Sequence, residues 1–382
     1  MDRRCARASI PVGSTKVSAP RIVAAGARVS PCAATERSGA DQAPVVDAGR
    51  GGHTAGSGTG LPGAPADLRP WSTGDISATL KSVELLLITG SAGRHLVDAL
   101  ATELGVDETF CHCERFPDGE ADVLVGDVRG GDVYVVQPTG PPVDEHTLEL
   151  LLILDACRRG GASRMTAVLP YLGYGRHDRR TRSGEAIGAW VVGDLLRTCG
   201  ADRVVLLDPH SASTEGLFAV PVEVASAWTE LVEALRHVVA ADAVVLAPDE
   251  GAVKIADRVA TELDRPLAFV RKRRVSGHDV VTGGVTGEVR GRPLLVVDDM
   301  ISTGATIRAA VGAALDAGAT PDVVVAACHG LFVGEGLRQF RELPIRHLFV
   351  TDSLPSSRSS PPSTRVVPIA RVLARTIRGL RG

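Results

Sequence analysis

Two adjacent carboxylates and the run of small residues after them could together bind a phosphorylated sugar. Asp298 and Asp299 end an apolar run that begins at Leu294, and a helical pattern begins near Ala305. Successive backbone N–H groups and hydroxyls at a helix start can hold a phosphate. The two carboxylates then face the hydroxyls of a sugar that carries this phosphate. The candidate residues are Asp298, Asp299, Ser302, Thr303, Gly304, Ala305 and Thr306.

An ordinary strand-to-helix turn with an acidic cap is the alternative interpretation of the same segment. It accounts for one acid and about one hydroxyl residue. It does not account for two consecutive acids followed by a run of Ser, Thr, Gly, Ala and Thr. We therefore favour a phosphate-binding loop.

A basic run lies after another apolar segment, within Val270–Gly277. It contains Lys272 and Arg274, and Lys272 is one of only four lysines in the chain, set among arginines. A basic run at a strand end is usually a solvated surface. This one precedes a glycine-containing stretch that is suited to a mobile lid over a site.

The elements that must position these residues alternate between strands and helices. Runs of Val, Leu and Ile between amphipathic helices are typical of parallel sheets covered on both faces. The predicted strands are 83–89, 132–137, 165–171, 203–208, 243–249, 266–271, 293–299, 322–329 and 347–352. The predicted helices are 95–104, 148–159, 185–198, 252–263 and 305–317. In such α/β sheets, ligands bind beyond the carboxyl ends of the strands, where residues 298–306 lie.

The chain divides into unequal parts near residue 80. Residues 1–80 are rich in Ala, Gly, Ser, Thr and Pro, with Trp71 as the one aromatic residue, so we expect a disordered leader. The spacing of Gly58, Gly60 and Gly63 is that of a nucleotide-binding loop, but no strand precedes it. The predicted domains are 81–225 and 226–365, followed by a C-terminal helix at 366–382.

Composition excludes several classes of protein. The 382 residues carry a formal net charge of −3, which leaves no surplus of positive charge for nucleic acid. No apolar run approaches the roughly 18 residues that span a bilayer. The seven cysteines are odd in number and widely spaced, which favours a reducing, cytoplasmic location over a disulfide scaffold. Cys111, His112 and Cys113 have no second Cys/His pair, so a structural zinc site is not expected.

The segment 294–307 resembles the phosphoribosyl-diphosphate (PRPP) loop that type I phosphoribosyltransferases share with ribose-phosphate diphosphokinase, the enzyme that makes PRPP. The resemblance implies an α/β fold of two tandem phosphoribosyltransferase-like domains with parallel sheets flanked by helices. It also implies that the loop binds the phosphate of ribose 5-phosphate and that Asp298 positions the ribose hydroxyls. A Walker-type phosphate loop is absent, which excludes a P-loop kinase.

Upstream segments separate a kinase from a transferase. Residues 116–120 resemble the F-x-D-G-E segment that contacts the adenine end of ATP in ribose-phosphate diphosphokinases, usually from a neighbouring subunit. Pro-Asp-Gly is also a strong turn signal, so a plain surface turn is the alternative. Residues 170–179 resemble the family's P-Y-x-x-Y-A-R-Q-D segment, with His in place of the usual Gln. The implied ATP-binding residues are Phe116, Asp118, Gly119, Glu120, Arg176 and His177.

The metal and the catalytic cations are implied by three further matches. Residues 208–210 resemble the D-L-H motif and 247–252 resemble S-P-D-x-G-G, which places His210 and Asp249 on the positions that bind Mg²⁺. A site with only two protein ligands suits a cation that keeps bound water and takes most of its ligands from phosphate. Lys272 and Arg274 fall on the two catalytic cations of the family's K-R-R loop.

Four positions depart from the family pattern: His177, Pro209, Ala252 and Ala305. Pro209 is the least conservative, because it removes a backbone donor beside His210 and restricts Asp208 to extended conformations. These departures favour one alternative function, a catalytically weak regulatory homologue that assembles with an active enzyme. The intact Lys272, Arg274, Asp249 and Asp298 count against it.

The resemblance implies the transfer of a diphosphoryl group from Mg-ATP to ribose 5-phosphate, which gives AMP and PRPP for nucleotide biosynthesis. It implies Mg²⁺ as cofactor, ATP and ribose 5-phosphate as substrates, and a homo-oligomer whose ATP site is shared between subunits. A phosphoribosyltransferase that consumes PRPP is the second alternative. It predicts no dependence on ATP and no role for residues 116–120.

Overall fold

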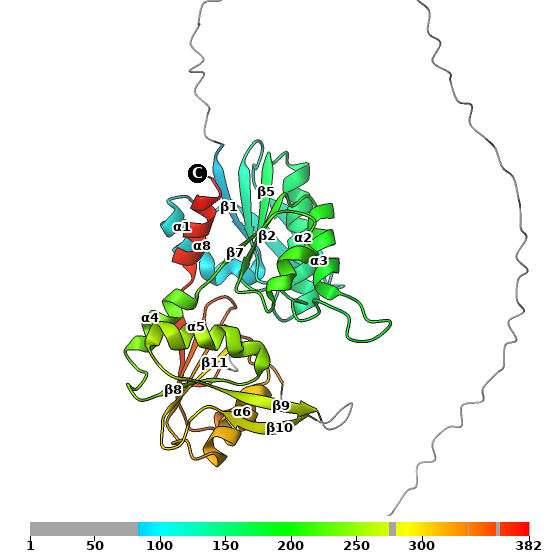
Figure 1. Cartoon of the computed structure of the whole chain (residues 1–382). Helices are drawn as coiled ribbons and strands as arrows, with labels where there is room; N and C mark the ends of the chain where they lie inside the picture. The colour runs from blue at the N-terminus through cyan, green and yellow to red at the C-terminus, as the bar shows by residue number, and fades with distance from the viewer. Residues whose placement is uncertain (1–82, 275–279, 335, 357–359, 382) are drawn as a thin grey trace, which may run out of the picture. The chain divides into compact units, whose positions relative to one another are not determined.

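Strands alternate with helices around two mostly parallel sheets (Figure 1). The computed structural model describes residues 83–274, 280–334, 336–356 and 360–381. The predicted leader at 1–80, with its glycine-rich spacing, lies outside the described residues, as do residues 275–277 of the basic run. No described helix is both long and apolar enough to cross a membrane.

The first sheet has five parallel strands in the order β1-β4-β5-β6-β7. Successive side chains point to opposite faces, and both faces are covered, so the strands are apolar throughout. Leu87 and Val136 belong to the core on one face, and Ile88 and Val135 to the core on the other. The strands are β1 (Leu85–Thr89), β4 (Asp132–Val136), β5 (Arg164–Leu169), β6 (Arg203–Leu207) and β7 (Val222–Ala225).

Helices cover both faces of this sheet, with α1 and α8 on one side and α2 and α3 on the other (Figure 1). They are α1 (Arg94–Leu104), α2 (Val143–Arg159), α3 (Gly188–Thr198) and α8 (Ala370–Gly379). Helix α8 lies within the segment where the sequence predicts a C-terminal helix. It packs against α1, although the two helices are far apart in the sequence. Short 3₁₀ turns are η1 (Ser91–Gly93), η2 (Ala212–Leu217) and η3 (Glu250–Ala252).

The second sheet has seven strands in the order β10-β9-β8-β11-β12-β13-β14, all parallel except β10. Its strands are β8 (Val244–Ala247), β9 (Leu267–Arg274), β10 (Val280–Thr286), β11 (Leu294–Ile301), β12 (Val323–Gly330), β13 (Ile345–Thr351) and β14 (Thr364–Val367). Its helices are α4 (Trp228–Arg236), α5 (Val253–Leu263), α6 (Ala305–Asp316) and α7 (Gly336–Arg341). One apolar cluster, which includes Val136, Trp228 and Val245, is continuous between the two sheets.

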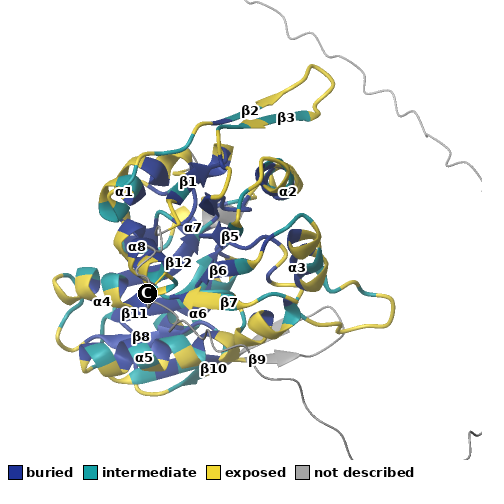
Figure 2. Ribbon diagram, turned by 90° about the horizontal axis from the view of Figure 1, so that it is seen from above, coloured by how far each residue is buried: buried dark blue, intermediate teal, exposed yellow. Residues whose placement is uncertain are grey.

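A two-stranded antiparallel hairpin, β2 (Cys111–Arg115) and β3 (Ala121–Val125), interrupts the first domain. Figure 2 shows it projecting away from β1 and α2. The sequence did not predict this hairpin, nor β7, β10, β14, α4 and α7. The expected parallel sheets are confirmed, with β10 as an antiparallel strand at the edge of the second sheet, where it pairs with β9, which continues to Arg274.

Candidate active site

A cavity of about 950 Å³ opens beyond the carboxyl ends of β6 and β11. Residues from both sheets line it, and they include most of those that the sequence singled out. The predicted residues in its wall are Arg176, His210, Asp249, Asp298, Asp299, Ser302, Thr303, Gly304, Ala305 and Thr306. The structure therefore brings the phosphate loop, the acid pair and the proposed metal ligands to one place.

The phosphate loop connects β11 to α6. Gly304 is the N-cap residue of α6, with φ of 77° and no side-chain cap, and Thr303 Oγ1 accepts a hydrogen bond from Ala305 N–H at 3.3 Å. An ideal Cβ at Gly304 would lie 2.5 Å from a ring carbon of the buried Phe340, so only glycine fits this turn. Gly304, Ala305 and Thr306, at the N-terminus of this 12-residue helix, line the cavity, and a helix N-terminus favours an anion.

The two carboxyl groups of the acid pair differ in how readily they ionise. Oδ2 of Asp299 lies 2.5 Å from Nδ1 of His210, which comes from the loop after β6. This hydrogen bond raises the pKa of His210. Burial opposes ionisation of Asp299, but the hydrogen bond and charge of His210 lower the pKa of Asp299 overall. Burial and the charge of Asp299 raise the pKa of Asp298 well above its ordinary value, so of the two acids Asp298 takes up a proton more readily.

Asp249 also lines the cavity, from the turn after β8. Its Oδ1 accepts hydrogen bonds from Gly251 N–H at 3.0 Å and Ala252 N–H at 3.3 Å, so Asp249 caps η3. Its charge also contributes to the raised pKa of Asp298. Among the described residues, no three His, Cys, Asp or Glu side chains converge as a metal cluster.

Asp208 has a left-handed backbone, with φ of 37°, and the expectation that Pro209 holds it extended is wrong. Tertiary hydrogen bonds fix this conformation. The carboxylate accepts from Ala227 N–H at 2.8 Å and from the Cys328 thiol at 3.2 Å, and the carbonyl lies 3.1 Å from Nε2 of the buried His329. These contacts outweigh the local preference, and they fix the backbone two residues before His210.

The proposed adenine segment does not line the cavity of its own chain. Residues 116–120 form the turn of the β2–β3 hairpin, closed by Phe116 N–H donating to Glu120 C=O at 2.8 Å. The Phe116 side chain is half exposed. The surface-turn interpretation is therefore right about conformation, and within one chain these residues do not meet the phosphate loop.

The residues of the 170–179 segment differ in whether they line the cavity. Arg176 is exposed and lines the cavity, whereas His177 does not line it. The ring of His177 lies 6.2 Å from that of Tyr174, and its carbonyl accepts from Ala189 N–H at 3.2 Å. Asp178 lines the cavity beside Arg176 and accepts a hydrogen bond from Ser213 Oγ at 3.0 Å, although the sequence had not singled it out.

Lys272 and Arg274 lie in the last part of β9, where their backbones pair with Thr282 and Val280 of β10. The sequence interpretation placed both residues in a loop beyond a strand that ended at Arg271. Their side chains are outside what the structure describes.

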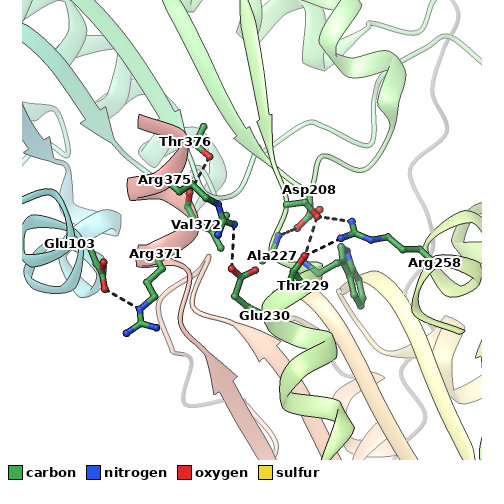
Figure 3. A network of polar contacts seen from close by, with 12 residues as sticks. Glu103, Asp208, Ala227, Thr229, Glu230, Arg258, Arg371, Val372, Arg375 and Thr376 are labelled. Carbon is green, nitrogen blue, oxygen red and sulfur yellow. Dashed lines mark hydrogen bonds and ion pairs between the residues drawn. The ribbon is translucent and has the colours of Figure 1, made fainter. Parts of the chain in front are cut away.

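Three lining residues had little or no signal in the sequence: Trp228, Lys254 and Arg258. They lie in amphipathic helices, where a single polar or aromatic residue is unremarkable; for Lys254, the rarity of lysine is the one signal. Figure 3 shows Arg258 of α5 reaching Thr229 of α4, with Nη2 and Oγ1 3.2 Å apart. Glu230 of α4 in turn pairs with Arg375 of α8 at 3.3 Å.

A sugar-phosphate loop after a central parallel strand, in the second of two similar α/β domains, defines a tandem phosphoribosyltransferase-type protein. Residues 85–200 match the N-terminal domain of ribose phosphate pyrophosphokinase, and residues 229–338 match the phosphoribosyl transferase domain. The chain belongs to the ribose-phosphate pyrophosphokinase family.

Individual relatives are similar over most of their length. The ribose-phosphate pyrophosphokinase of Corynebacterium efficiens is 39% identical over 298 residues, which cover 77% of this chain and 91% of the relative. The chloroplastic enzyme 1 of Arabidopsis thaliana is 38% identical, with 79% and 76% covered. The crystal structure of phosphoribosylpyrophosphate synthetase from Mycobacterium smegmatis superposes with a TM-score of 0.73 at 38% identity, covering 78% of this chain and 98% of that one.

Proposed function

We propose that this protein transfers the diphosphoryl group of ATP to O1 of ribose 5-phosphate, which gives AMP and PRPP. The anomeric hydroxyl attacks the β-phosphorus of ATP, and AMP leaves. The observation that carries the proposal is the joint placement of Arg176, His210 and Asp249 with the phosphate loop around one cavity. Membership of the ribose-phosphate pyrophosphokinase family supports it.

The loop of residues 302–306 is proposed to bind the 5-phosphate, because the N-terminus of α6 supplies N–H donors and a positive dipole. Asp298 and Asp299 are proposed to hold the ribose hydroxyls. A protonated acid beside an ionised one offers both a donor and an acceptor to a vicinal diol. Catalysis then consists of positioning and of stabilising developing charge, with no covalent intermediate.

His210 and Asp249 are proposed to hold Mg²⁺ carried in with ATP. The donor set suits the ion, because a carboxylate that holds one imidazole nitrogen fixes the ring, and His210 Nε2 would then be the nitrogen to bind a cation. Few protein ligands and a wide cavity leave room for water and phosphate oxygens. When bound, Mg²⁺ would neutralise charge on the ATP phosphates.

Lys272 and Arg274 are proposed as the catalytic cations, acting on charge that develops on the transferred diphosphoryl group. Both lie in β9, which pairs directly with β8, the strand that leads to Asp249. Arg176 is proposed to hold ATP phosphates with its planar guanidinium, and His177 to contact ATP in place of the usual Gln.

A second copy of the chain is proposed to supply the adenine contacts. Phe116 offers a stacking face, while Asp118, Gly119 and Glu120 lie on the same hairpin turn, away from the cavity of their own chain. Phe110, Leu124 and Trp190, from the same domain, are more than half exposed, which supports an interface there. The protein is accordingly proposed to be a cytoplasmic homo-oligomer.

Release of AMP that depends on both ATP and ribose 5-phosphate tests the proposal. A transferase that consumes PRPP releases no AMP, and a regulatory homologue releases none when assayed alone. The assay is best run in parallel on the full chain and on a chain that begins at residue 81. We propose that residues 1–80 are dispensable, since every proposed site residue lies beyond residue 80. We also propose that the two domains divide near residue 225.

A further inference from the structure

Two thiols at the base of the β2–β3 hairpin converge outside the candidate active site. Cys111 and Cys113 alternate with His112 along β2, so their side chains share one face of the strand. Their Sγ atoms are 3.5 Å apart. His112 shares the other face with Glu114, at 3.8 Å between Nε2 and Oε2. The Cys-His-Cys motif therefore presents a dithiol rather than three metal ligands.

The hydrogen bond within the pair makes Cys111 the more acidic thiol, because it lowers the pKa of Cys111 and raises that of Cys113. The guanidinium of Arg94 donates a hydrogen bond to the Cys111 carbonyl at 2.6 Å, which holds a positive charge close to the thiols. The hydrogen bond from Cys113, together with the charge of Arg94, lowers the pKa of Cys111 against the effect of burial. Burial raises the pKa of Cys157, in the same apolar cluster, to about 12.

We propose that Cys111 and Cys113 are a redox-sensitive pair, which peroxide closes into a reversible disulfide within β2. Cys111 is buried, but Cys113 is partly exposed, and this gives a small oxidant access to the pair. Their Sγ atoms are 3.5 Å apart, and a disulfide bond is about 2.0 Å long, so the two atoms must approach by roughly 1.5 Å.

The chemistry balances with hydrogen peroxide as the oxidant. The thiolate of the pair attacks peroxide; a sulfur–oxygen bond forms, the oxygen–oxygen bond breaks and hydroxide leaves. The second sulfur then attacks the sulfenic acid, a sulfur–sulfur bond forms and the sulfur–oxygen bond breaks. The hydroxide from peroxide takes up the proton that was lost when the thiolate formed, and the hydroxide that leaves the sulfenic acid takes the remaining thiol proton. The two sulfurs lose two electrons in total, and one peroxide becomes two waters.

Closure changes the shape of the hairpin base. Alternate Cα atoms of an extended strand are about 6.4–6.8 Å apart, which is the upper end of the roughly 4.4–6.8 Å that disulfides bridge. A disulfide between these residues therefore shortens β2 where Cys111 pairs with Val125 and Cys113 with Val123. The turn that carries Phe116 begins three residues beyond Cys113, so this shortening redirects the turn.

A functional consequence follows if the proposed function is right, because the turn then carries the adenine contacts. Oxidation should weaken the binding of ATP and leave the binding of ribose 5-phosphate unchanged. We expect a rise of about tenfold in the apparent KM for ATP, the effect of losing one stacked ring. A dithiol reductant should reverse it.

The reduced full chain is treated with hydrogen peroxide, denatured in N-ethylmaleimide and digested with trypsin. Residues 95–115 form one tryptic peptide that contains both cysteines, whereas Cys157 and Cys199 fall in other peptides. We expect the 95–115 peptide to become two hydrogens lighter than its reduced form and to escape alkylation. Dithiothreitol should restore alkylation. Cys113→Ser should abolish the disulfide, and Cys199→Ser, the matched control, should leave it unchanged.

The proposal is overturned if peptide 95–115 stays fully alkylated at peroxide concentrations that oxidise Cys199. A bond between Cys111 and Cys157, or sulfinic acid on Cys113 alone, overturns it as well. A disulfide without any change in ATP dependence refutes the coupling to the hairpin. Absence of AMP release from the reduced protein refutes the proposed function instead, and the peptide mapping still reports on the thiols.

Discussion

Nδ1 of His210 lies 2.5 Å from Oδ2 of Asp299, although the two residues are 89 positions apart. His210 follows β6 of the first sheet, and Asp299 belongs to β11 of the second. The contact joins a proposed metal ligand to the acid pair that is proposed to hold ribose. The proposed metal and sugar subsites therefore share one hydrogen bond, and we expect changes at either residue to affect both.

Asp299→Asn should raise the Mg²⁺ concentration required for half-maximal activity. The amide keeps the size of the side chain but removes the charge that orients the His210 ring and makes it more basic. Loss of such a carboxylate behind a metal-binding His typically costs about 10–100-fold in metal affinity. A Mg²⁺ titration of initial rate measures it. Asp155→Asn, at a surface acid of α2, is the control, and an unchanged Mg²⁺ dependence of Asp299→Asn would refute the role of this contact.

Lys272→Ala should lower kcat by about a hundredfold or more, with little change in the KM for ATP, because its charge is proposed to act mainly in the transition state. Lys272→Arg should also be impaired, since a planar fork does not replace a compact ammonium. Steady-state kinetics with each substrate varied measures both. Arg197→Ala, on the surface of α3, should be neutral. Near-normal turnover of Lys272→Ala would exclude it as a catalytic cation.

Gly304→Ala should destabilise the protein by about 1–3 kcal/mol. The added Cβ would lie 2.5 Å from the ring of Phe340. The alanine would also have to adopt a φ of 77°, which alanine rarely does. Urea unfolding measures the free energy change. Gly312→Ala is a matched control in the same helix: its Cβ meets nothing within 4 Å, so it should stabilise by about 0.5–1 kcal/mol. If both variants behave alike, the tight turn is not a constraint on stability.

Local features of the site could be read from the sequence, and contacts made by the fold could not. The strand, the acids and the helix start at residues 294–307 are adjacent in the chain, so apolar runs and turn chemistry predict them. The Asp208 backbone departs from expectation because Ala227, Cys328 and His329 together outweigh the local effect of Pro209. No sequence rule brings those residues to Asp208.

The β2–β3 hairpin was missed for a different physical reason. Its first strand reads Cys-His-Cys-Glu-Arg, which lacks the apolar alternation by which strands are recognised. The strand is stabilised by pairing with β3 and by contact of β3 with α2 rather than by burial of both faces. Its turn, by contrast, was predictable from Pro-Asp-Gly, because turn chemistry is local.

Stability should fall as pH drops through about 6.5, in part because of His329. This side chain is buried, with Nε2 3.1 Å from the Asp208 carbonyl and Nδ1 2.8 Å from Ser353 Oγ. A carbonyl only accepts, so Nε2 carries a proton. Burial lowers the pKa of His329 in the folded state. The unfolded chain therefore binds the proton more readily, and acid favours unfolding.

Urea unfolding of the wild type and of His329→Gln at pH 7.5 and 5.5 measures this contribution. The loss of stability between the two pH values should be smaller in the variant. The comparison cancels the other titrating groups, including His210, whose raised pKa acts with the opposite sign. An identical pH dependence in both proteins would show that His329 does not contribute.

Asp298→Asn and Phe116→Ala should have opposite effects on the two substrates. Asp298 lies in the cavity beside the phosphate loop, whereas Phe116 lies on the hairpin turn outside it. Each is proposed to touch one substrate in the ground state, so its loss should appear in the binding of that substrate alone. Asp298→Asn should raise the KM for ribose 5-phosphate and spare ATP. Phe116→Ala should cost roughly 1–2 kcal/mol in ATP binding, about tenfold in apparent affinity.

Mixing the two variants tests whether the ATP site is shared between subunits. In a shared site, a subunit with an intact cavity can use the hairpin of a subunit with an altered cavity. Co-expressed Asp298→Asn and Phe116→Ala chains should therefore regain part of the activity that each lacks alone. Asp155→Asn, a surface change on α2, is paired with Asp298→Asn to control for general effects of mixing. Phe116→Ala with unaltered ATP dependence would remove the hairpin from the site and leave its exposed ring unexplained.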